Sequence, residues 1–272
     1  MKNTAFLLSF AVPFIFTAVF SADDADAGLF KKQPRREVGK AVPLIAKDSL
    51  DGWTNNAGKA PGTGWNVENG VLHLKGKGGD LITEKQYQNF ILDFSWKIAK
   101  GGNSGIKYRY KKFDDKGWLG LEFQVLDDFN TQEGKKAKNS TATLYDILPV
   151  DGEKQLNPND QLNHGQVIVL GNRIQHFLNG KKTVDVIVGS PEWKNGITAS
   201  KFKDIKGFGE NPLGYIHVQD HGSEVWFQDI TIQEITPKKG LLHKKAEGVF
   251  HNLRQYKGFS QRRISLQKRI IR

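Results

Sequence analysis

The chain has 272 residues, of which 38% are hydrophobic and 11% aromatic, enough for one large all-β domain or two small ones. Cysteine is absent, which excludes disulfides, cysteine-ligated metals, thiol nucleophiles and an acylated lipoprotein anchor. The formal net charge is +11, but residues 238–272 hold eleven basic residues and one acid, and residues 28–48 hold six basic and two acidic residues. The central part is close to neutral, which argues against nucleic acid as its ligand, because that ligand needs a basic stripe on the folded surface.

Residues 1–27 have the pattern of a cleaved secretory signal. Lys2 supplies the positive start, and the apolar run Ala5–Phe20 is shorter than the roughly 20 residues of a comfortable membrane span. Ala25-Asp26-Ala27 fits a small-x-small cleavage site, and an uncleaved anchor is the alternative. An exported chain without cysteine favours a bacterial export route, so we expect a secreted or periplasmic protein.

Residues 28–41 are charged and aperiodic, which indicates a linker, and the folded domain is expected over residues 42–236. Short strand-like runs recur there between Gly, Asn and Asp residues. They are Val71–Leu74, Phe90–Ile98, Gly105–Tyr110, Leu119–Leu126, Gln166–Leu170, Arg173–Leu178, Thr183–Val188, Tyr215–Gln219 and Val225–Ile235. The pairs Asn69-Gly70 and Asn179-Gly180 favour tight hairpin turns. With no long helical period, the pattern predicts an all-β fold, a two-sheet antiparallel sandwich of jelly-roll type.

Residues 237–272 form a basic extension in which apolar side chains are scattered among lysines and arginines. Pro237 ends the last predicted strand. The composition favours a solvated extension. A tether to an anionic polymer or membrane surface, and a docked amphipathic helix, are the alternatives.

Two consecutive predicted strands carry polar side chains on one face. In the second strand, Glu122 and Gln124 share a face, because successive strand side chains point to opposite sides. In the first strand, the same alternation places Arg109 with Lys107 and puts Tyr110 on the opposite, apolar face. We therefore expect Arg109, Glu122 and Gln124 to line a polar groove suited to hydroxyl-rich ligands.

Nine short motifs follow one another across residues 42–236. They are Trp65–Val71 (WNVENGV), Gly79–Glu84 (GDLITE), Tyr87–Phe94 (YQNFILDF), Gly102–Ile106 (GNSGI) with Arg109, Leu121–Asp128 (LEFQVLDD), Ala142–Asp146 (ATLYD), His176–Gly180 (HFLNG), Gly214–Gly222 (GYIHVQDHG) and Val225–Phe227 (VWF). In this order they resemble the bacterial 3-keto-disaccharide hydrolase family, long known only as a domain of unknown function. One departure is Leu162-Asn163-His164-Gly165, where the family often carries Glu-Trp-Asn.

The resemblance implies a concanavalin A-like jelly roll with a ligand cleft, and action on sugars whose C3 hydroxyl has been oxidised to a ketone. Such a ketone acidifies the C2 hydrogen, so a base can remove it and the C1 substituent can leave by β-elimination, with water completing a net hydrolysis. We expect His221 to be the base, Arg109 to stabilise the enolate, and Glu122 to orient hydroxyls or hold a cation. The expected substrate-binding residues are Asn103, Gln124, Tyr145, Gln219, Asp220 and Trp118.

A divalent metal is the alternative electrophile, with Glu122, Asp127 and His221 as candidate ligands. The signal is weak, because no short-spaced ligand motif is present. The expected partner is a carbohydrate substrate.

Three functions fit the sequence: an enzyme acting on 3-keto-glycosides, a non-catalytic carbohydrate-binding module on the same fold, and a surface protein that uses its basic extension. An ordinary retaining glycosidase is disfavoured. It needs two carboxylates about 5–5.5 Å apart, whereas the face of Glu122 carries one acid.

Overall fold

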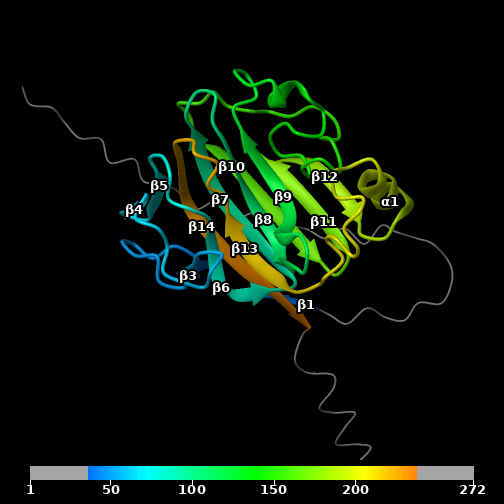
Figure 1. Cartoon of the computed structure of the whole chain (residues 1–272), viewed down its shortest axis with the longest axis horizontal. Helices are drawn as coiled ribbons and strands as arrows, with labels where there is room; N and C mark the ends of the chain where they lie inside the picture. The colour runs from blue at the N-terminus through cyan, green and yellow to red at the C-terminus, as the bar shows by residue number, and fades with distance from the viewer. Residues whose placement is uncertain (1–35, 238–272) are drawn as a thin grey trace, which may run out of the picture. The chain divides into compact units, whose positions relative to one another are not determined.

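The computed structural model describes residues 36–237, which form two antiparallel β-sheets packed face to face (Figure 1). This confirms the expected all-β, two-sheet sandwich. The predicted signal peptide, most of the linker and the basic extension beyond Pro237 lie outside the described residues. Within the described part, no helix has the length and apolar character needed to cross a membrane.

The larger sheet has nine strands in the order β12-β11-β10-β7-β14-β5-β4, with β1 and β2 also pairing with β14. Its strands are β1 (Arg36–Val38), β2 (Val42–Pro43), β4 (Trp65–Glu68), β5 (Val71–Leu74), β7 (Phe90–Ile98), β10 (Asn163–Leu170), β11 (Arg173–Leu178), β12 (Lys181–Ile187) and β14 (Val225–Pro237). The long strands β7 and β14 pair with each other near its centre, so segments distant in sequence are joined there.

The smaller sheet has five strands in the order β3-β6-β13-β8-β9. They are β3 (Trp53–Thr54), β6 (Leu81–Tyr87), β8 (Asn103–Phe113), β9 (Gly117–Leu126) and β13 (Gly214–Val218). Two short helices complete the described elements, the 3₁₀ turn η1 (Glu133–Lys135) and α1 (Pro191–Thr198), which contacts β12. The side chain of Ser190 caps α1 by accepting a hydrogen bond from Trp193 N at 3.2 Å.

The core lies between the two sheets and is built from alternate strand residues. Phe94 of β7 meets Phe123 of β9 edge to face, with ring centroids 5.1 Å apart. Tyr108 of β8 and His176 of β11 share a fully buried hydrogen bond (Oη–Nε2 2.8 Å) across the sandwich. Burial lowers the pKa of His176 to about 3, because the charged imidazolium cannot be hydrated there.

The two Asn-Gly pairs form the predicted turns. Asn69 and Gly70 join β4 to β5, and Asn179 and Gly180 join β11 to β12. All four residues have positive φ, between 48° and 80°, as a tight hairpin turn of the primed type requires. Each predicted strand-like run overlaps an observed strand. The first turn sets the register of β4 with β5, and the second sets the first pairs of β11 with β12, up to a bulge between His176 and Phe177.

Candidate functional site

A polar hollow of about 130 Å³ opens on the outer face of the five-stranded sheet. Its lining residues are Asn103, Lys107, Leu119, Gly120, Glu122, Gln124, Tyr145, Lys201, Phe202, Gln219 and His221. Strands β8 and β9 supply the floor, and residues beyond the ends of β9, α1 and β13 supply the wall. Six of the predicted site residues therefore come together, namely Asn103, Glu122, Gln124, Tyr145, Gln219 and His221.

Glu122 is the acid of this hollow, with only 7% of its surface exposed. It pairs across the sheet with Lys107, whose Nζ lies 3.8 Å from Oε2. Burial raises the pKa of Glu122 above its usual value, and the charges of Lys107 and Lys201 offset part of that rise. Burial and the two ammonium groups therefore act on the protonation of Glu122 in opposite directions.

The backbone beside Glu122 is shaped to receive its carboxyl group. A Cβ atom on Gly105, in the neighbouring strand β8, would lie 2.3 Å from Glu122 Oε1. No side chain fits at position 105 while Glu122 keeps its place, since the two atoms would overlap. The glycine of the GNSGI motif therefore makes room for the acid.

Two amides hold the same carboxyl group. With its nitrogen turned toward Glu122, Gln124 donates to Oε1 at 3.0 Å. With its side-chain amide turned in the same way, Gln219 donates to Glu122 Oε1 at 3.3 Å and accepts from Lys107 Nζ at 3.1 Å. These orientations follow from the hydrogen-bonding partners. They join Glu122, Lys107 and both glutamines in one network that links the floor of the hollow to its wall.

Loop residues close the hollow from the side. Tyr145 is held in place by its backbone N–H, which donates to Glu122 O at 3.1 Å. Lys201 Nζ lies 4.3 Å from the centre of the Tyr145 ring, a cation–π contact. His221 follows β13, is exposed, and lines the same hollow as Glu122. The wall thus adds an accessible imidazole to the hollow that holds the buried acid.

Arg109 is not part of this hollow, and the expectation that it shares a face with Glu122 is wrong. Strand β8 carries a bulge between Tyr108 and Lys111, where two of its residues oppose one residue of β9. The extra residue reverses the inward and outward alternation. Arg109, with φ of 49°, donates to Gly209 O at 2.7 Å and to Gly171 O, in the turn after β10, at 2.5 Å. It is 1% exposed, and burial lowers the pKa of its guanidinium.

The bulge also turns Tyr110 outward, against the expectation that it packs with Ile106 and Tyr108. Its ring stacks on His217 at 4.3 Å and on Trp118 at 5.5 Å. His217 is fully buried, and its Nε2 lies 3.2 Å from Asp80 Oδ1 without the alignment of a hydrogen bond. Burial lowers the pKa of His217 to about 4. Trp118 lines a separate hollow on the same face.

Two predicted acids bind backbone outside the hollow. Asp220 accepts from Gly78 N and Gly79 N, both at 2.7 Å, and so ties β13 to the loop before β6. Asp127 accepts from Gly101 N at 2.6 Å and from Phe129 N at 3.1 Å.

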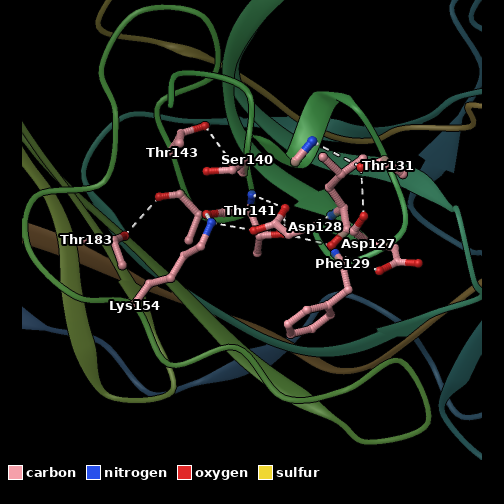
Figure 2. A network of polar contacts seen from close by, with 12 residues as sticks. Asp127, Asp128, Phe129, Thr131, Ser140, Thr141, Thr143, Lys154 and Thr183 are labelled. Carbon is pink, nitrogen blue, oxygen red and sulfur yellow. Dashed lines mark hydrogen bonds and ion pairs between the residues drawn. The ribbon is translucent and has the colours of Figure 1, made fainter. Parts of the chain in front are cut away.

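Figure 2 shows Asp127 within a polar network after β9, next to Asp128, which accepts from Thr141 and pairs with Lys154. Asp127 therefore does not converge with Glu122 and His221 as a metal ligand. Across residues 36–237, no three His, Asp or Glu side chains are grouped so that they could hold a metal ion.

Comparison with known proteins places this chain in a family. The model of the 3-keto-alpha-glucoside-1,2-lyase-like domain matches residues 40–233. The chain belongs to this family. It is similar to a 3-keto-disaccharide hydrolase from Bacteroides thetaiotaomicron, with 29% identity over 225 residues that cover 71% of this chain and 77% of that protein.

Two crystal structures from Parabacteroides distasonis, both provisionally described as glycosyl hydrolases, are also similar. One is 30% identical with a TM-score of 0.65, covering 72% of this chain and 94% of that chain. The other is 26% identical with a TM-score of 0.57, covering 72% and 99%. Both relatives are covered almost completely by this member of the 3-keto-alpha-glucoside-1,2-lyase-like family.

Five lining residues of the hollow were not predicted as site residues, namely Lys107, Leu119, Gly120, Lys201 and Phe202. The alternation pattern placed Lys107 on the polar face, but the cationic role was given to Arg109, whose motif resembles the family. Lys201 and Phe202 follow α1 in a segment with no strand pattern, so nothing local in the sequence points to them. They reach the hollow only through the folded path of this loop.

Proposed function

We propose that this chain is a carbohydrate-active enzyme that cleaves 3-keto-glycosides or 3-keto-disaccharides, as a hydrolase or lyase, by removing the C2 proton and breaking the bond at C1. The observation that carries the proposal is the buried, amide-bound Glu122 facing Lys107 in a hollow whose wall holds the exposed His221. Family membership and the similarity to a 3-keto-disaccharide hydrolase support the same class of substrate.

His221 is proposed to be the base. An imidazole can accept a proton near neutral pH, and an exposed ring at the wall can pass that proton to solvent. As the C2–H bond breaks, its electron pair forms the C2–C3 double bond of an enolate, and negative charge develops on the C3 oxygen. Lys107 takes the stabilising role first expected of Arg109, because its ammonium group lies in the hollow.

Glu122 is proposed to be the acid for the leaving oxygen. The enolate re-forms the C3 ketone, a C1–C2 double bond forms, and the C1–O bond breaks. The departing oxygen then needs a proton, which a carboxyl group of raised pKa can supply. Addition of water across the new double bond returns a 3-keto-sugar and completes a net hydrolysis. Without that addition, the unsaturated product leaves and the reaction is that of a lyase.

The remaining polar groups of the hollow are suited to the hydroxyl groups of a sugar. Asn103, Gln124, Gln219 and Tyr145 all line it and offer both donors and acceptors. Glu122 is the one carboxylate among the lining residues, whereas direct displacement by a retaining glycosidase needs two, about 5–5.5 Å apart. One acid with one base and one cation suits elimination better.

The proposal extends to the whole chain as the sequence suggests. We infer a concanavalin A-like jelly roll over residues 42–236, export directed by residues 1–27, and a basic extension from residue 237 as a separate segment. A divalent cation stays a prediction, and its direct test is turnover after chelation and after the metal is added back.

The test is incubation of the full domain with 3-keto-maltose, followed by chromatography of the products. We expect glucose to be released by the wild type and release to fall at least about 100-fold in His221→Ala, the lower range for loss of a general base. His164→Ala is the matched control, because His164 is an exposed histidine on the other sheet, 3.3 Å from Asp93. Binding without release would favour the carbohydrate-binding module. Near-normal release by His221→Ala would remove His221 from the mechanism.

A further inference from the structure

A second hollow, of about 580 Å³, lies on the same sheet face as the polar hollow. We call it the aromatic hollow. Its lining residues include Asn56, Glu84, Lys112, Trp118 and Tyr215. We infer that it binds the leaving-group sugar ring of a disaccharide whose 3-keto ring occupies the polar hollow, an assignment that rests on the proposed function.

The strand register places the two hollows in line. Trp118 and Glu122 are four residues apart on β9, so their side chains share a face. Glu122 pairs with Lys107 and Trp118 pairs with Lys112 on β8, so each hollow uses one pair of this ladder. Four residues of strand span about 13 Å, so the two hollows are neighbours along this face of the sheet.

Chemistry fixes which ring occupies which hollow. The groups proposed for proton transfer, Glu122 and His221, line the polar hollow, so C1 and C2 of the oxidised ring must lie there. In a disaccharide oxidised on its non-reducing ring, that ring continues to the second sugar only through the C1 oxygen. Any ring that extends from the polar hollow is therefore the leaving group.

The aromatic hollow has the surface that a sugar ring needs. One face of the Trp118 indole stacks on Tyr110 (5.5 Å, 19°), and Tyr215 meets its edge at 5.9 Å. Tyr110 is itself fixed by a hydrogen bond to Asn56 Oδ1 at 3.0 Å. Trp118 is only half-buried, so a rigid aromatic platform is presented to the hollow. Such side chains offer the apolar area on which the C–H face of a pyranose packs.

Polar groups surround that platform. Glu84 and Lys112 are exposed at the rim and supply an acceptor and donors for hydroxyl groups. An aromatic surface combined with a few polar groups at its margin is the usual make-up of a small-molecule site. The hollow is larger than the polar one, which suits a leaving group of variable identity.

The experiment compares two substrates in Trp118→Ala. For 3-keto-maltose, which carries a second ring, we expect kcat/KM to fall by about tenfold or more, the loss of one stacking contact. For methyl 3-keto-α-glucoside, which lacks that ring, the fall should be no more than about threefold. Trp226→Ala is the matched control, since Trp226 is a half-buried tryptophan on the other sheet, stacked on His73. Equal losses for both substrates, or no loss for either, would overturn the inference.

A failure of the proposed function would look different. If the wild type releases no sugar from either substrate, saturation-transfer NMR with 3-keto-maltose replaces kinetics. Transfer to the reducing ring that is present in the wild type and lost in Trp118→Ala would retain the sugar site without the chemistry. Transfer that is absent, or unchanged by the substitution, would remove the site as well.

Discussion

Replacing Arg109 with alanine tests whether this residue stabilises the fold or takes part in catalysis. The side chain donates two hydrogen bonds to carbonyl oxygens, those of Gly209 and Gly171, and is 1% exposed. Hydrogen bonds to a charged group contribute about 1.5–3 kcal/mol each, and the substitution leaves both carbonyls without this partner. Alanine suffers about the same backbone strain at φ of 49° as arginine, so that cost cancels.

We expect Arg109→Ala to lower the free energy of unfolding by about 3–5 kcal/mol. In a domain of this size, that corresponds to a melting temperature lower by roughly 10 °C. Denaturant unfolding followed by tryptophan fluorescence measures the first quantity, and kcat/KM per folded molecule measures catalysis. The latter should stay within about threefold of the wild type, because the guanidinium does not line the polar hollow.

The matched control is Arg173→Ala. Arg173 is half-exposed and binds Asp185 through two hydrogen bonds of 2.8 and 2.9 Å, so its removal should cost about 1 kcal/mol or less. Arg109→Lys should recover only part of the lost stability, because a single ammonium does not reproduce the planar fork that reaches both carbonyls. A variant Arg109→Ala that keeps its stability but loses turnover more than about 100-fold would refute this reasoning and return Arg109 to the chemistry.

Three further predictions concern the polar hollow and the buried His217. Gly105→Ala should lower kcat/KM at least about tenfold while the protein stays folded, because the new Cβ displaces the Glu122 carboxyl; unchanged kinetics would contradict that placement. Glu122→Gln should abolish turnover. Its free energy of unfolding should rise relative to that of the wild type as pH goes from 4 to 7, because the raised pKa of Glu122 means that ionisation destabilises the folded state. A stability difference between the two proteins that does not depend on pH would contradict this prediction. The free energy of unfolding of the wild type should fall as pH drops from about 6.5 to 4, because the unfolded chain's histidine binds a proton in this range and folded His217, with a pKa of about 4, does not. The urea midpoint of His217→Gln should fall less steeply over the same range. An equally steep fall in the variant would show that other groups cause the pH dependence.

Much of the fold could be predicted from local pattern. Alternation of apolar and polar residues located nine strands, and the pairs Asn69-Gly70 and Asn179-Gly180 fixed two hairpins, because these signals depend only on neighbouring residues. The short strands β1 to β4 were not predicted, and β1 lies within the segment expected to be a linker. The longer strand β6 was also missed. Between the pairs Tyr215–Gln86 and His217–Ile82, β13 has one residue and β6 has three. This irregular pairing interrupts the alternation of apolar and polar residues in β6. The helix α1 was missed because eight residues carry too little period to detect.

The candidate site was predicted less completely, because part of it depends on pairing between strands and on the path of loops. Glu122 and Gln124 follow regular alternation on β9 and were placed correctly. Arg109 was misplaced, since a bulge depends on pairing with a partner strand and leaves no reliable mark in the sequence. Lys201 reaches the hollow from a loop, and its position depends on the tertiary path of the chain.

The bulge in β8 has a consequence for how this protein can evolve. Before the bulge, the even-numbered side chains of β8 up to Tyr108 enter the core. Beyond the bulge, the odd-numbered Phe113 enters the core, and Tyr110 points to the outer face, where it stacks on Trp118. Deleting either Arg109 or Tyr110 would give β8 and β9 equal numbers of residues between the pairs Tyr108–Leu121 and Lys111–Leu119, so the later residues of β8 would keep their partners and their faces. A deletion in a regular part of the strand would instead move every later side chain to the opposite face. Natural variation in the length of this strand should therefore be concentrated at residues 109 and 110.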